Sequence, residues 1–191
     1  RRLFSEGTFN AAFVPSYSSE LVLGKKKAQK FSNKIFNLLF ISILFIVFII
    51  EIFMPGFVFL IAPGFKDNVD KLDTTISLTR ITFPFLLFVS LASFFSAILN
   101  SHNKFAAASA SPIILNIILI LFLFFSKLLN DQLVYYLSYG VSLAGILQLF
   151  FLYKFVSKHY SLKFNLKFNF NNKVKIFFKK LLPSIFSSGV T

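Results

Sequence analysis

The sequence predicts an all-α fold, a polytopic bundle of transmembrane helices. Three long stretches, residues 81–101, 105–126 and 132–153, are apolar and contain no charged side chain, and residues 35–50 form a shorter one. About 20 apolar residues at a rise of roughly 1.5 Å each cross a hydrocarbon core of about 30 Å. Hydrophobic residues make up 56% of the chain, whereas a typical soluble domain has about 45–50%. The helices are apolar nearly all round, as contact with lipid or a large buried bundle requires.

The helices follow one another with short connections, and breaker residues separate them. The first helix, which we expect to begin before residue 1, stops near Gly24. The second stops before Pro55-Gly56, and a short interfacial helix at 57–61 closes at Ala62-Pro63-Gly64. Residues 70–77 lead into the third helix, and Pro112 lies inside the fourth. We expect helices at 1–23, 28–53, 78–101, 105–126 and 133–157, with another starting at 181. We expect the chain to be an internal fragment of a longer transporter.

The charges on the connections alternate along the chain. The connections around Lys25, Lys104 and Lys167 are basic, whereas the acids Asp67, Asp70, Asp73 and Asp131 balance lysines on the connections between them. Basic loops face the cytoplasm in membrane proteins, so this alternation predicts those three connections on the cytoplasmic side. The net charge of +13 is therefore interpreted as a topology signal with contacts to anionic membrane lipids, and not as nucleic-acid binding.

The composition excludes several kinds of site. The chain has no cysteine, which rules out a disulfide framework or a thiolate metal site within it. His102 and His159 are isolated in predicted loops, and no phosphate loop, nucleophile constellation or metal-ligand spacing is present, so nothing supports an enzyme, a cofactor or a bound metal. Five tyrosines near span ends are interpreted as interface aromatics: Tyr17, Tyr135, Tyr136, Tyr153 and Tyr160.

The residues most informative about function are polar groups at predicted membrane depth. Placing such a group inside the membrane costs free energy, so those that occur there are usually functional. Arg1 lies roughly 28 Å of helix from the cytoplasmic end of the first helix, and Arg2 and Glu6 are spaced to pair at i,i+4. Arg80 opens the third helix. A shorter first helix would make Arg1, Arg2 and Glu6 interfacial, with their charges extending toward water, and Arg80 can extend toward water in the same way at the start of its own helix.

Neutral polar residues and small residues also occur within the spans. Asn100, Asn116 and Gln148 are expected to form hydrogen bonds between helices, and the small-residue run at 106–111 predicts close helix packing. Pro112 frees a backbone carbonyl and can kink its helix, which gives a cavity wall or a hinge.

Several motifs occur in order and at the expected spacing across nearly the whole chain. Residues 1–15 (RRLFSEGTFNAAFVP), 62–65 (APGF), 80–84 (RITFP), 97–105 (AILNSHNKF) and 111–116 (SPIILN) resemble signatures of the MurJ (MviN) family of bacterial lipid II flippases. Lys104 stands where that family frequently has Arg, and the connection at 159–180 is unusually rich in Lys and Asn.

The resemblance implies a fold of fourteen helices in two lobes, of the multidrug/oligosaccharidyl-lipid/polysaccharide exporter superfamily. The chain would be part of the N-terminal lobe of a monomer in the bacterial cytoplasmic (inner) membrane, and the C-terminal lobe would be needed for function. It also implies transport of lipid II for peptidoglycan and cell-wall biogenesis. Arg1 matches an essential cavity arginine of the family, and Arg2, Glu6 and Arg80 are the other candidate substrate-binding residues.

The negative charge of that substrate is complementary to the basic residues. A lipid-linked saccharide diphosphate has an anionic head that cannot cross hydrocarbon unaided, and arginines make charge-assisted contacts with phosphates. The alternative is an exporter of another lipid-linked saccharide or of a drug, in the same superfamily. A cationic drug would need acidic cavity residues, so Arg1 and Arg2 favour an anionic substrate.

Overall fold

The computed structural model describes residues 8–65, 68–128, 133–163 and 179. All regular structure within these residues is helical, and four stretches there are long and apolar enough to span a membrane: Lys25–Ile52, Val69–Ser101, Phe105–Ser126 and Leu133–Val156. The expected all-α transmembrane bundle is confirmed. The elements, in order, are α1 (Thr8–Val22), α2 (Lys25–Ile52), α3 (Met54–Ile61), the 3₁₀ turn η1 (Pro63–Phe65), α4 (Val69–Thr82), α5 (Phe85–Ser101), α6 (Phe105–Leu128) and α7 (Leu133–Val156).

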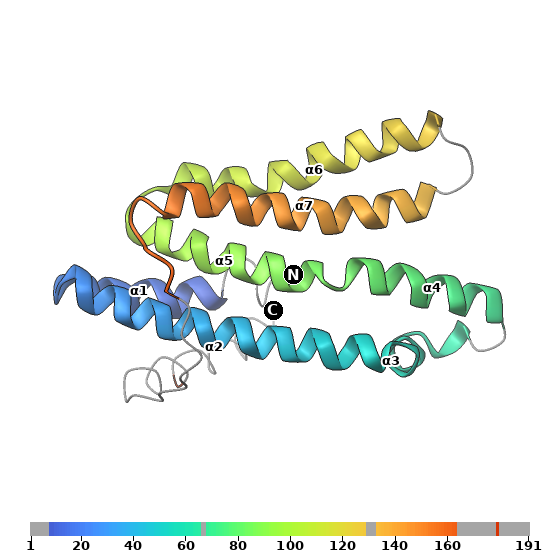
Figure 1. Ribbon diagram of the computed structural model, residues 1–191, viewed down its shortest axis with the longest axis horizontal. Helices are drawn as coiled ribbons and strands as arrows, with labels where there is room; N and C mark the ends of the chain where they lie inside the picture. Colours follow the sequence, from blue (N-terminus) through green and yellow to red (C-terminus); the bar gives the residue numbers. More distant parts are fainter. Residues whose placement is uncertain (1–7, 66–67, 129–132, 164–178, 180–191) are drawn as a thin grey trace.

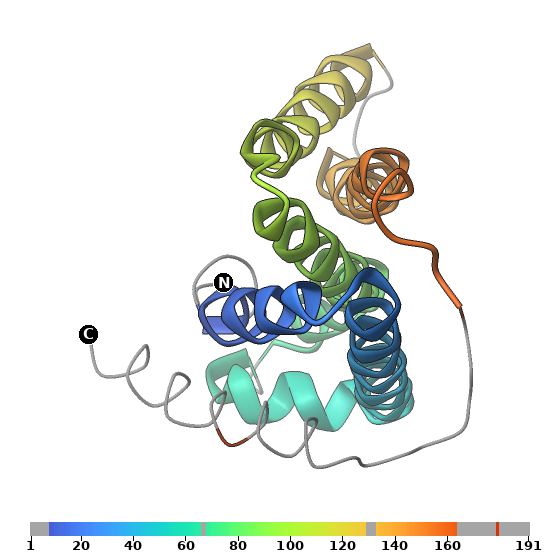
Figure 2. The ribbon, with the colours of Figure 1, turned by 90° about the vertical axis from the view of Figure 1, so that its left-hand side faces the viewer.

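The long helices pack side by side along one axis (Figure 1). α1 packs against α2 and α5, and α7 packs against α4, α5 and α6. The view along the bundle shows α5 in the middle, with α1 and α2 on one side of it and α6 and α7 on the other (Figure 2). α5 is therefore the helix around which the bundle is organised, and it carries the longest run of buried residues.

Aromatic side chains join the first helices to α5. Phe13 and Phe94 are fully buried and meet edge to face, with their ring centroids 5.2 Å apart, and Phe36 of α2 lies 5.4 Å from Phe94. Such pairs add about 0.5–1.5 kcal/mol each beyond the burial of their area. Tyr17 and Tyr160 are only 2% exposed, so these two tyrosines are core residues and not the interface aromatics that the sequence suggested.

The third predicted helix is longer than expected and is broken in two. α4 begins at Val69 because Asn68 caps it, with its side-chain oxygen accepting a hydrogen bond from the Lys71 amide at 2.9 Å. The break falls at residues 83–84 because Pro84 lacks an amide hydrogen and cannot continue the helical ladder. Ser142 of α7 donates a hydrogen bond to the carbonyl oxygen of Ile81 beside this break.

The other boundaries differ only slightly from expectation. α2 begins at Lys25 and α3 at Met54, each three residues before the predicted start, and α1 ends at Val22. The predicted helix from residue 181 and most of the basic segment at 159–180 lie outside the described residues.

Basic and acidic connections lie at opposite ends of the bundle. The connection before Lys25, the α5–α6 turn and the residues after α7 lie at one end, and the start of α4 with Asp70 and Asp73 lies at the other (Figure 1). The α5–α6 turn is tight because Asn103 adopts a left-handed conformation (φ 57), which lets the Lys104 amide bond the Leu99 carbonyl at 2.9 Å. This grouping agrees with the alternation of charge, which assigns the basic end to the cytoplasm.

Candidate functional site

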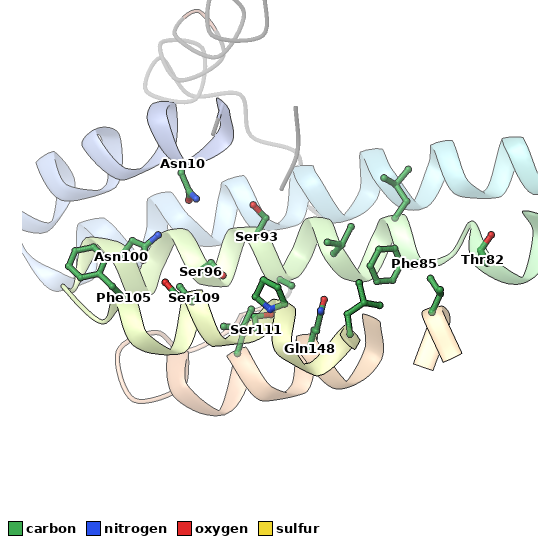
Figure 3. A pocket seen from close by; sticks show the side chains of 18 of the residues that line it. Asn10, Thr82, Phe85, Ser93, Ser96, Asn100, Phe105, Ser109, Ser111 and Gln148 are labelled. Carbon is green, nitrogen blue, oxygen red and sulfur yellow. The ribbon is translucent and has the colours of Figure 1, made fainter. Parts of the chain in front are cut away.

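A cavity of about 930 Å³ lies among α1, α5, α6 and α7. Figure 3 shows its lining side chains, which are contributed mainly by α5 and α6. The apolar part of the wall comes from residues at the start of α5 and from Pro112 and Leu115 of α6. A cavity of this size is large enough to hold a small ligand, since ligand sites occupy about 300–1,000 Å³.

The polar part of the wall consists of hydroxyl and amide side chains. No charged residue lines the cavity within the part of the chain that the structure describes. Neutral groups of this kind both donate and accept hydrogen bonds. They come from α1, α4, α5, α6 and α7: Asn10, Thr82, Ser93, Ser96, Asn100, Ser109, Ser111 and Gln148.

Helical spacing places the polar groups of α5 on one face. Ser93, Ser96 and Asn100 are three and four residues apart, and side chains at these spacings lie one above another on a helix. On α6, Pro112 cannot donate a hydrogen bond to the carbonyl of Ala108, and both residues line the cavity. Pro112 thus lies in a cavity wall, which is one of the two roles expected for it.

Two polar residues of the cavity wall are largely buried. Gln148 is 4% exposed and Ser111 is 6% exposed, and neither side chain makes a hydrogen bond to any part of the described chain. Figure 3 shows the Gln148 amide turned toward the cavity, on the same side as Ser111. Neither Gln148 nor Asn100 makes the expected helix-to-helix hydrogen bond with another described residue, and both side chains line the cavity.

The charged residues singled out by the sequence are not brought together here. Arg1, Arg2 and Glu6 lie outside the described residues. Arg80 is exposed in the last turn of α4 and is not part of the cavity wall, although its neighbour Thr82 is. Arg80 interacts electrostatically with the carboxylate of Glu51 at the end of α2.

A second polar cluster lies at the basic end of the bundle. His102 and His159 stack on each other, and the Tyr17 hydroxyl lies 3.3 Å from Nε2 of His102. Burial lowers the pKa of His102, and the charges of His159 and Lys25 lower it further. Burial also raises the pKa of Tyr160, whose hydroxyl donates to Asn33 of α2. The two histidines, which looked isolated in the sequence, thus join α1, the α5–α6 turn and the segment after α7.

Sequence reasoning missed most of the cavity wall. The serines of α5 were not singled out, although their spacing with Asn100 was a signal for a polar face. The small residues 106–111 were interpreted only as a packing surface, and Ala108, Ser109 and Ser111 line the cavity instead.

Comparison with known proteins decides the family. The profile of a family described as "Lipid II flippase MurJ" matches residues 1–191, the whole chain. The chain belongs to the MurJ lipid II flippase family. The resemblance drawn from its motifs is confirmed.

Individual relatives agree with the family match. The chain is 40% identical over 192 residues to a probable lipid II flippase MurJ of Rickettsia prowazekii, and 40% identical over 197 residues to one of Rhizobium tropici. Each alignment covers 100% of this chain and 37% of the relative. A solved structure, "Lipid II flippase MurJ, inward closed conformation", superimposes with a TM-score of 0.78 at 27% identity and covers 100% of this chain and 38% of that one.

The chain therefore spans a little over a third of the length of its MurJ relatives. Membership of this bacterial family, together with four candidate membrane spans, places the chain in the bacterial cytoplasmic membrane. The helix order and the cavity described above belong to one part of a MurJ-type protein.

Proposed function

We propose that the full-length protein containing this chain moves lipid II from the cytoplasmic to the outer leaflet, for peptidoglycan synthesis. The observation that carries the proposal is the family match over the whole chain. Its support from the structure is a cavity among helices that can span a membrane, with hydroxyl and amide groups in a largely apolar wall. The mechanism is transport by alternating access of two lobes, without covalent chemistry.

Within this proposal the arginines recognise the diphosphate. Arg1 contacts the phosphates through its planar guanidinium, and Glu6 orients Arg2 by pairing at i,i+4. Arg80 has a smaller role, because it is exposed at the end of α4 and interacts with Glu51. The protein acts as a monomer that requires its C-terminal lobe, and its basic connections contact anionic membrane lipids.

Complementation tests this function. The full-length gene is expressed in a bacterium depleted of its own lipid II flippase, with membrane levels of the protein checked. Restored growth and cell shape are expected. Failure to restore growth at normal membrane levels would contradict the proposal and favour another lipid-linked saccharide as the cargo.

A further inference from the structure

The break between α4 and α5 leaves two backbone carbonyls without the donors that a continuous helix would supply. Pro84 has no amide hydrogen, so it cannot donate to the carbonyl of Arg80 four residues earlier. The next carbonyl, that of Ile81, would accept from the amide of Phe85, and among the described residues no backbone amide bonds it. Its hydrogen bond comes instead from another helix, from the hydroxyl of Ser142 on α7.

The two helices on either side of the break are packed to very different degrees. Nine of the 17 residues of α5 are buried, whereas none of the 14 residues of α4 is buried by the described chain. A segment with few buried contacts opens and moves more easily than one in the core. α5 is therefore held firmly in the bundle, and α4 is held mainly by contacts close to the break.

α7 crosses the break and packs against both α4 and α5. A Cβ on Gly145 would lie 2.6 Å from Cδ2 of Phe85 and 3.1 Å from Cβ of Phe88, so the glycine lets α7 approach the start of α5 closely. Ser142 lies three residues before Gly145 and therefore on the same face of α7. This face touches the start of α5 and, through Ser142, the end of α4.

The break is also connected to α3. The ring of Phe83, in the break, meets the ring of Phe57 edge to face, with the centroids 5.6 Å apart. α4 packs against α3 along its length as well. A change in the angle of α4 would therefore move α3, which lies toward the end of the bundle opposite the basic connections (Figure 1).

We infer that residues 83–84 form a hinge, and that the Ser142 hydroxyl is the latch that sets the angle between α4 and α5. With the latch made, α4 continues along the direction of α5, as Figure 1 shows. With the latch broken, α4 tilts at the hinge and α3 moves with it. One neutral hydrogen bond is weak enough to open and strong enough to bias the two arrangements about fivefold.

A distance measurement on the full-length protein tests the hinge. Spin labels are placed on Asp73→Cys of α4 and Tyr139→Cys of α7, both exposed, in a protein without other cysteines reconstituted in liposomes. The distribution of distances between the labels is measured by pulsed electron resonance. Ser142→Ala should raise the population of the tilted arrangement about fivefold, which is the value of one hydrogen bond.

Two controls show whether the change belongs to the latch. Ser138→Ala removes a buried hydroxyl one turn earlier on α7, which bonds the carbonyl of Val134 in its own helix at 2.9 Å, and should leave the distribution unchanged. A label pair on Val22→Cys of α1 and Tyr139→Cys does not include α4. Its distances should be the same in the parent protein and in Ser142→Ala.

Two further variants act on the hinge itself. Ser142→Thr keeps the hydroxyl and should retain the distribution of the parent protein. Pro84→Ala supplies an amide for the carbonyl of Arg80, so the helical ladder becomes continuous and the distribution should narrow to one distance. This opposite effect separates a hinge from a general loss of packing, which would widen the distribution in every variant.

Three results would overturn the inference. The first is the same distribution between Asp73 and Tyr139 in Ser142→Ala as in the parent protein. The second is an equal change in the control pair, which would mean that α7 itself had moved. The third is an unchanged or wider distribution in Pro84→Ala. The measurement needs no transport, so the hinge stands if complementation fails, and the proposed function stands if the hinge is wrong.

Discussion

His102 stacks on His159 with the ring centroids 4.7 Å apart and the ring planes inclined by 22°. The two residues are far apart in the chain, one in the α5–α6 turn and the other just after α7. Tyr17 of α1 meets the edge of the same pair, with its ring centroid 5.9 Å from that of His102. This contact thus joins α1, the α5–α6 turn and the segment after α7 at the basic end.

This contact predicts a pH dependence of stability. The pKa of His102 is lowered in the folded protein, chiefly by burial, from an ordinary value of 6.5. As pH falls through about 6.5, the unfolded chain binds the proton first, so stability is complete above that pH and is lost below it. The melting temperature of the full-length protein in detergent should fall between about pH 7.5 and pH 5.5.

His102→Gln provides the control for that measurement. It removes the titrating group while retaining a polar side chain that can bond the Tyr17 hydroxyl. The fall in melting temperature with pH should be smaller than in the parent protein. Parallel melting curves for both proteins across this pH range would show that His102 does not couple protonation to folding.

The start of α6 gives a packing prediction. Ala107 packs against the buried core of α1, α2 and α5, whereas its neighbour Ala106 is exposed. A larger side chain at a packed position costs about 1–3 kcal/mol. Ala107→Leu should lower the folded yield and melting temperature of the full-length protein, and Ala106→Leu should leave both near normal. Equal behaviour of the two variants would mean that Ala107 has room for a larger side chain.

The distribution of charge predicts the orientation in the membrane. Lys26, Lys104 and Lys167 should face the cytoplasm, and Asp70 and Asp131 the opposite side. Single cysteines at these positions, in an otherwise cysteine-free full-length protein, are labelled with an impermeant maleimide in intact cells. Asp70→Cys should react from outside and Lys104→Cys only after lysis. The reverse pattern would invert the proposed topology.

Arg1 is expected to be essential for transport. Arg1→Ala should abolish most complementation although the protein reaches the membrane, and Arg1→Lys should restore only part because Lys lacks the planar two-point contact with phosphate. Arg80→Ala should have a smaller effect, since Arg80 is exposed and lies off the cavity wall. Growth supported fully by Arg1→Ala would exclude this residue from the mechanism.

The sequence was sufficient for features that depend on local patterns. The membrane spans follow from unbroken apolar runs, and the tight turn at 101–104 follows from the short distance between two of them. The sequence prediction placed the start of this helix too late, because residues 70–77 are polar and were interpreted as a connection. A polar helix of this kind can form without an apolar face when a residue such as Asn68 caps its first turn.

Features that depend on several helices could not be predicted in the same way. The position of Gln148 in the cavity wall could not be predicted from the sequence, because it depends on how α5 and α6 pack around α7. The same holds for His102 and His159, which are separated by two transmembrane helices in the sequence and become neighbours only when α7 packs against α5. The resemblance to the MurJ family supplied the proposed function, which no spacing of residues in the chain indicates by itself.

The central claim is that the complete protein moves lipid II across a membrane, and reconstitution tests it most directly. The purified full-length protein is placed in liposomes that contain labelled lipid II, and the fraction of its head group accessible to an impermeant modifying enzyme is followed. The account predicts that protein-containing liposomes expose lipid II from the inner leaflet, and that Arg1→Ala liposomes do so far more slowly. Exposure no faster than in protein-free liposomes would contradict it.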